Sequence, residues 1–80
     1  MEEILTLADL KVGESGVITG VEGENALRCR LLDMGLIPKT LVTVRKVAPA
    51  GDPIELRLRG YELTIRRGDA RGITVLRERV

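Results

Sequence analysis

The sequence predicts a mainly β fold: a small, strongly bent barrel of about five short strands, with one α-helix between the first two strands, in a single domain over residues 1–80. Three observations lead to this fold class. One segment has the apolar spacing of a helix, and the segments after it alternate apolar and polar residues as half-buried strands do. A chain of 80 residues buries only roughly 60% of its unfolded surface, so its margin of stability is thin. With one cysteine and no histidine, packing of aliphatic side chains must hold the core together.

The helix is expected over residues 24–34. Its apolar residues fall at positions i, i+4 and i+7, which is one helical face: Leu27, Leu31 and Met34. Gly35 follows in the C′ position, where a left-handed backbone conformation costs glycine little. Leu36 can then fold back onto the last turn, and Pro38 prevents the helix from continuing. The sequence therefore predicts a helix with a well-defined end.

The five strands are expected at residues 15–22, 39–47 and 54–59, around Leu63 and Ile65, and around Ile73 and Val75. Gly16 and Gly20 lie inside the first of them, and glycine within a strand often marks a bend or a bulge. The third strand has the clearest pattern, because apolar and charged residues alternate strictly along it. Closing such strands into a barrel would remove exposed edges that otherwise aggregate.

Turns are expected between these elements. Thr6 is a candidate cap for a single helical turn within residues 4–10, which would lie as a lid over the core. Gly60-Tyr61 fits the two-residue loop of a type II′ hairpin, with glycine first. Residues 67–72 contain two glycines and an aspartate and predict a tight turn.

Composition argues against catalysis and against several ligand classes. Histidine, the commonest acid–base group near neutral pH, is absent, and 13 basic residues almost balance 12 acidic ones. Nucleic-acid binders usually carry a clear basic excess, so we expect no nucleic-acid partner. No segment approaches the roughly 20 apolar residues of a membrane span, and the acidic start is unlike a secretory signal. We therefore expect a cytoplasmic, non-enzymatic protein without a cofactor.

Several motifs have a structural interpretation that is stronger than the functional one. The glycines between Gly13 and Gly23 are not followed by the lysine and hydroxyl of a phosphate-binding loop. Cys29 has no partner ligand, so we expect an inert, partly buried thiol and no metal site. Four carboxylates could offer oxygen ligands but are expected to pair with arginines instead: Asp52, Glu55, Glu62 and Asp69. Arg57, Arg59 and Arg66 lack the interleaved aromatics of an RNA-binding stripe.

A binding patch is the remaining candidate for a functional site. Leu32 is large and apolar but falls off the main apolar face of the helix. With Arg28 and Arg30 beside it, Leu32 would be the apolar centre of a patch with a charged rim, to which Ile37 and Tyr61 at the hairpin tip also belong. Alternatively, the barrel wraps the helix on two sides and buries Leu32.

The sequence resembles the ferrous iron transport protein A family, FeoA. The resemblance runs from about Leu7 to Val75 and rests on four motifs in a fixed order: Arg30-Leu31-Leu32-Asp33-Met34-Gly35-Leu36-Ile37-Pro38, Ala48-Pro49-Ala50-Gly51-Asp52-Pro53-Ile54, Arg59-Gly60-Tyr61-Glu62-Leu63, and Arg66-Arg67 with Asp69-Ala70 and Ile73-Thr74-Val75. Lys39 departs from the family, in which glycine often follows the proline of the helix exit. If this position needs a positive φ, lysine would be strained there.

The resemblance implies an SH3-like barrel and a partner, the membrane iron transporter FeoB, which carries its own GTP-binding domain. It thus implies an adaptor or regulator of ferrous iron uptake that reaches the membrane only through this partner. The same fold resembles the C-terminal domain of iron-dependent repressors. A metal-sensing or corepressor module is therefore the alternative function.

Overall fold

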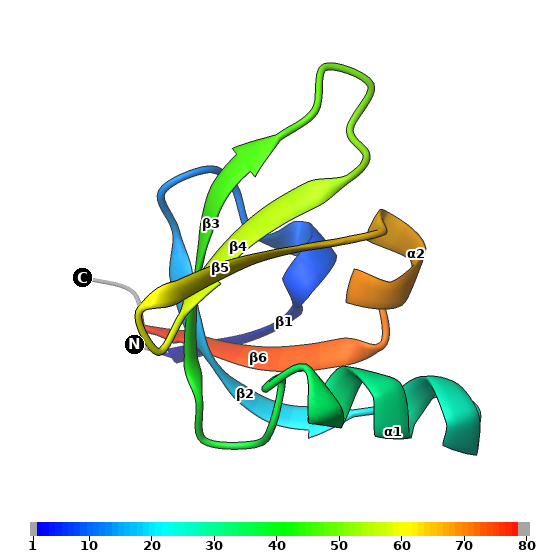
Figure 1. The fold of residues 1–80 in the computed structure, drawn as a ribbon. Helices are drawn as coiled ribbons and strands as arrows, with labels where there is room; N and C mark the ends of the chain where they lie inside the picture. Colours follow the sequence, from blue (N-terminus) through cyan, green and yellow to red (C-terminus); the bar gives the residue numbers. More distant parts are fainter. Residues whose placement is uncertain (1, 79–80) are drawn as a thin grey trace.

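The computed structural model describes residues 2–78 of the chain (Figure 1). In this range it has six strands: β1 (Glu2–Thr6), β2 (Ser15–Val21), β3 (Leu41–Val47), β4 (Ile54–Leu58), β5 (Tyr61–Ile65) and β6 (Ile73–Glu78). It also has a 3₁₀ turn and two helices: η1 (Leu7–Asp9), α1 (Asn25–Asp33) and α2 (Arg67–Ala70). The mainly β fold with one short central helix is therefore confirmed.

All six strands belong to one antiparallel sheet in the order β1-β6-β2-β3-β4-β5. The sheet is strongly bent, and η1 and α2 lie inside the curve (Figure 1). The pairing of β2 with β6 shifts between Ile18 and Gly20, so the glycine-rich strand does contain an irregularity, as expected. Strong bending lets one sheet wrap around a single core.

β1 was not expected from the sequence, and because of it α1 lies between the second and third strands. Its partner is the last strand, with Ile4 opposite Leu76. Arg77 of β6 forms ion pairs with Glu3 of β1 and with Glu14 before β2. Pairing between two ends of a chain leaves no local pattern, so the residues of β1 did not reveal it.

The core is built almost entirely from aliphatic side chains that the strands turn inward. Within residues 2–78, fourteen buried hydrophobic residues form one cluster: Leu7, Leu10, Ile18, Leu31, Leu36, Val42, Val44, Ile54, Leu56, Leu58, Ile65, Ala70, Ile73 and Val75. Leu7 and Leu10 come from the short turn, which is the expected lid. The Thr6 backbone N–H and hydroxyl both donate to Asp9 Oδ2, at 3.0 and 3.1 Å, and this fixes the turn.

Helix α1 ends where the sequence predicts, in a Schellman motif. Gly35 has φ +101°, its N–H donates to the Leu32 carbonyl at 2.9 Å, and the Leu36 N–H donates to the Leu31 carbonyl at 3.1 Å. Leu36 is fully buried against the core. The Tyr61 hydroxyl donates a further hydrogen bond to the Met34 carbonyl. The end of the helix is thus tied both to the core and to the β4–β5 hairpin.

The β4–β5 hairpin differs from its prediction. Leu58 pairs with Tyr61, so the two-residue loop is Arg59-Gly60, and both residues have positive φ (50° and 83°). This is a type I′ turn, not type II′ with Gly60 first. The Arg59 guanidinium donates to Thr40 Oγ1 at 3.2 Å. This contact helps to hold Arg59 at positive φ, a conformation that costs it more than it would cost glycine. Residues 67–70 also differ, since they form the short helix α2 where a tight turn was expected.

Lys39 has φ +74°, so the position does require the conformation that favours glycine. Its N–H donates to the Ile18 carbonyl at 2.7 Å, while the Ile18 N–H donates to the Thr40 carbonyl at 2.9 Å. Both hydrogen bonds depend on the sharp turn of the chain at Lys39. The expected strain at this departure from the family is therefore present.

Gly35→Ala should lower the free energy of unfolding by at least about 1–2 kcal/mol, the cost of a left-handed conformation for a residue with a Cβ. The new Cβ would also overlap the Tyr61 hydroxyl. Removing that hydroxyl should therefore cost less in the Gly35→Ala background than in the wild type. Urea unfolding of Gly35→Ala, Tyr61→Phe and the double variant measures this coupling. Gly68→Ala is the control, because its Cβ meets no atom within 4 Å and its φ is ordinary. Additive effects would show that Tyr61 does not constrain Gly35.

Lys39→Gly should have the opposite effect and raise the free energy of unfolding by about 1 kcal/mol, since glycine adopts φ +74° without steric cost. Thermal melts with urea titrations measure it. Lys11→Gly, in an exposed turn, controls for loss of a lysine charge. A destabilised Lys39→Gly protein would mean that the lysine side chain makes a compensating contact.

Candidate functional site

The structure divides the expected binding patch between two flanks of α1. Arg28 and Arg30 are two residues apart, so about 200° of rotation separates their side chains around the helix axis. Arg28 donates to Asn25 Oδ1 at 3.4 Å, whereas the Arg30 guanidinium lies 3.5 Å from Oδ2 of Asp69 in α2. Leu32, four residues after Arg28, lies on the Arg28 flank and is half-buried. The burial of Leu32 is thus intermediate between the two alternatives that the sequence leaves open, the apolar centre of a surface patch and a side chain buried by the barrel.

Ile37 and Tyr61 lie beyond the C-terminal end of α1. Ile37 is half-buried in the exit loop, and Tyr61 is 42% exposed while its hydroxyl bonds to the Met34 carbonyl. Tyr61 therefore joins the hairpin to the helix end, as a patch containing both would require. Arg30 remains apart from Arg28 and Leu32.

A hollow of about 190 Å³ lies on the Arg30 flank, between α1, the end of β5 and α2. Its lining combines apolar side chains with two arginines and one aspartate: Arg30, Leu31, Met34, Thr64, Ile65, Arg66 and Asp69. The Arg30 side chain is 64% exposed, and Arg66 is exposed as well. The hollow therefore has an apolar base with guanidinium groups at its rim.

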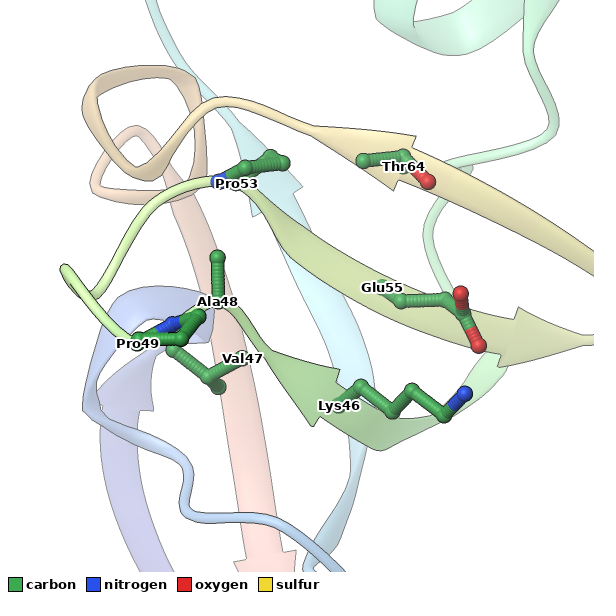
Figure 2. A pocket seen from close by; sticks show the side chains of 7 residues that line it. All are labelled: Lys46, Val47, Ala48, Pro49, Pro53, Glu55 and Thr64. Atoms are coloured by element: carbon green, nitrogen blue, oxygen red, sulfur yellow. The ribbon is translucent and has the colours of Figure 1, made fainter.

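A second hollow of about 320 Å³ lies on the outer side of β3, β4 and β5, next to the β3–β4 loop (Figure 2). It is lined by Lys46, Val47, Ala48, Pro49, Pro53, Glu55 and Thr64. Lys46, Glu55 and Thr64 are opposite one another on neighbouring strands, and Figure 2 shows the Lys46 and Glu55 side chains running in the same direction. Thr64 borders both hollows.

Between the two hollows, β5 forms one edge of the sheet. Leu58 and Tyr61 close a two-residue hairpin and exchange both of their backbone hydrogen bonds. Hydrogen-bonded and non-hydrogen-bonded pairs alternate from there, so Glu62 and Thr64 are in non-hydrogen-bonded pairs with Arg57 and Glu55. The backbone N–H and C=O groups of Glu62 and Thr64 therefore point away from β4, towards the open edge.

An apolar row on the outer face of the sheet was missed by the sequence analysis. Four residues that are opposite one another across β1, β6, β2 and β3 form it: Ile4, Leu76, Val17 and Leu41. Ile4 and Leu41 are 74% and 58% exposed. The sequence does contain a signal, because each strand has two adjacent apolar residues and only one of them can face inward: Ile4-Leu5, Val17-Ile18, Leu41-Val42 and Val75-Leu76.

Metal ligands do not gather in the described part of the chain. Residues 2–78 contain no group of three or more cysteine and carboxylate side chains that could hold an ion. Glu62 lies 3.5 Å from Arg45, and Asp69 is similarly paired with Arg30. Cys29 is exposed, so the expectation of a partly buried thiol was wrong, because this side of α1 faces away from the sheet. No helix within residues 2–78 is long and apolar enough to cross a bilayer.

These features define a class: a small SH3-like β domain with hollows on its surface. Comparison with known proteins gives the family. The model of the FeoA domain family matches residues 5–77, and the chain belongs to this family. The resemblance noted in the sequence is thereby confirmed.

The relatives include a fusion protein and a FeoA protein of known structure. The Fe(2+) transport protein A/Fe(2+) transporter FeoB fusion protein of Porphyromonas gingivalis is 38% identical over 71 residues, which are 89% of this chain and 8% of that protein. The solution structure of FeoA from Chlorobium tepidum is 43% identical and aligns 94% of this chain with 71% of that one, at a TM-score of 0.86. This chain thus spans only a small part of its curated relative.

More distant structures share the fold alone. FeoA of Stenotrophomonas maltophilia, solved with zinc and described as an SH3 domain protein, is 21% identical, with 95% of this chain aligned to 99% of that one at a TM-score of 0.78. A manganese-dependent transcriptional repressor aligns with 94% of this chain and 37% of its own at a TM-score of 0.86, with 13% identity. The SH3-like fold is thus shown, and the likeness to repressors gives no functional argument.

Amide hydrogen exchange checks the open edge of β5. The amides of Glu62 and Thr64 should exchange rapidly, whereas those of Leu63 and Ile65, which pair with β4, should be protected. NMR exchange rates at neutral pH measure this alternation. Uniform protection along β5 would show that its edge is covered in the free protein.

Proposed function

We propose that this protein is a non-enzymatic adaptor that binds a FeoB-type transporter in the cytosol and influences ferrous iron uptake. The fused relative supports this most directly, because its name places a Fe(2+) transport protein A unit and a FeoB transporter in one chain. Covalent fusion keeps two modules at a high effective concentration. Such proximity is useful to two units that act together, so the fusion favours a joint role for them.

The chemistry of the chain supports a binding role. It has no histidine, and its carboxylates at the candidate site pair with arginines. Chemistry near neutral pH usually needs a group that exchanges protons there, and histidine is the commonest such group. The surface instead offers half-buried apolar residues bordered by arginines, a composition that is common at protein interfaces.

We place the transporter-binding surface on the α1 flank and the helix exit, at Arg28, Leu32 and Ile37, with Tyr61 holding the exit loop through Met34. Leu32 is half-buried, so part of it is rigidly packed while the rest is available to a partner. Arg30 faces the other side of the helix and would contribute through the hollow it lines. The membrane is reached only through the transporter, and no nucleic acid takes part.

Leu32→Glu should weaken binding to the transporter at least about tenfold, the effect of removing an apolar anchor at an interface. Biolayer interferometry would use full-length FeoB in detergent and, separately, its soluble GTP-binding domain, each in apo, GDP-bound and GTP-analogue-bound forms. Circular dichroism of the variant shows whether it still folds.

Val12→Glu is the matched control, since Val12 is 59% exposed and lies in the turn before β2, outside α1 and its exit loop. It introduces the same charge without touching the patch and should bind like the wild type. If the wild-type protein binds neither form of the transporter in any nucleotide state, the adaptor function is wrong. Equal weakening by both variants would instead move the surface away from Leu32.

A further inference from the structure

We infer that the edge of β5 beside α1 is a peptide-binding site that takes an extended acidic segment of another protein as an additional strand. This goes beyond the proposed function, because it names the chemistry of a ligand and a site distinct from the Leu32 flank. It holds whether or not that ligand belongs to the transporter.

Unpaired backbone groups supply the first part of the site. Glu62 and Thr64 direct their N–H and C=O groups away from β4, and within residues 2–78 no strand pairs with this edge. An extended peptide can use such groups for main-chain hydrogen bonds, the mode known as β-augmentation. At one end of the strand, Tyr61 contacts the Met34 carbonyl and ties β5 to the helix exit. A peptide would therefore pair chiefly at the Thr64 end.

The two hollows supply places for side chains. Successive residues of a strand point to opposite faces of a sheet. A strand added beside Thr64 would direct one residue inward, to the hollow lined by Leu31, Ile65 and Met34, and the next outward, to the end of the Lys46–Glu55–Thr64 row. Hollows of about 190 and 320 Å³ each have room for a side chain, so the geometry accommodates two successive residues of a short strand.

Charge decides which peptides fit. Arg30 and Arg66 both line the smaller hollow, between α1, the end of β5 and α2. Within residues 2–78, the Arg66 side chain forms no hydrogen bond or ion pair. The Arg30 guanidinium uses one of its five N–H donors, at 3.5 Å from Asp69, and remains 64% exposed. Guanidinium groups bind carboxylates in a bidentate manner. Glu62, the acidic residue at the hairpin end of β5, is already paired with Arg45. The segment should therefore carry a carboxylate where it passes between Arg30 and Arg66.

A titration with defined probes tests the site. The probe is a short fluorescein-labelled peptide in which valine and glutamate alternate, and its counterparts replace glutamate with lysine or carry N-methyl groups along one edge. Fluorescence anisotropy should show binding of the acidic peptide and at least about tenfold weaker binding of the other two. In NMR spectra, the acidic peptide should shift the amides of Glu62 and Thr64 and slow their exchange. Equal binding of the lysine peptide would overturn the proposal.

Two pairs of variants locate the contacts. Thr64→Pro removes an edge N–H that does not bond to β4, and proline is tolerated on edge strands, so binding should be lost while the fold remains. Thr64→Val keeps the N–H and should bind normally. Arg30→Glu should weaken binding about tenfold or more, whereas Lys11→Glu, which changes charge equally in a remote turn, should not. If Thr64→Pro fails to fold, the N-methylated peptide provides the same test from the ligand side.

Sedimentation equilibrium measures the oligomeric state and so tests for the other possible occupant of this edge, a second copy of this chain. A dimer with slow amide exchange at Glu62 and Thr64 in the absence of peptide would show that this edge pairs with a second copy of the chain, and would overturn the proposal. Unchanged peptide binding in Thr64→Pro would do the same. Neither result affects the transporter-binding test at Leu32, so the two proposals fail independently.

Discussion

The end of α1 is the constraint on which the rest of this structure depends. Gly35 takes a conformation that only glycine adopts cheaply, and this lets Leu36 turn back into the core while Leu31 receives its N–H. The Tyr61 hydroxyl then bonds to the Met34 carbonyl and fixes the hairpin against the same point. Through these contacts, one well-defined helix end sets the positions of both the helix flank and the edge of β5. The constraint matters because the aliphatic core of an 80-residue chain has little stability to spare.

Much of this arrangement was predictable because its signals are local. The helix, its glycine end, the buried alternation of Ile54, Leu56 and Leu58, and the lid with Leu7 all follow from spacing within a few residues. β1 was not predictable in this way, since its partner is at the other end of the chain. The turn type of the β4–β5 hairpin was also missed, because Arg59 has positive φ and is held there by Thr40, which is 19 residues away. Contacts that are distant in sequence account for most of the differences.

The candidate site was predictable only in its parts. The sequence indicates that Leu32 is off the main helical face and that Tyr61 is at a hairpin. Leu32 occupies the expected helix, whereas Tyr61 is the first residue of β5 and not part of the hairpin loop. The spacing of Arg28 and Arg30 places them on different flanks of a helix, but the sequence could not show which flank faces the end of β5 and α2, because that depends on how α1 packs. The outer row from Ile4 to Leu41 needs the strand order, which no local pattern contains. Surfaces assembled from neighbouring strands are thus harder to predict than the core beneath them.

The strand order also separates the surfaces that could bind partners. The apolar row crosses β1, β6, β2 and β3, whereas the open edge belongs to β5, two strands beyond the end of that row. A peptide strand added to β5 would therefore leave Ile4, Val17 and Leu41 exposed. The row is only a few side chains long, while a stable interface covers roughly 800 Å² on each partner. A partner that uses the row must consequently draw on polar surroundings as well, or be held nearby by a second contact, as covalent fusion would hold it.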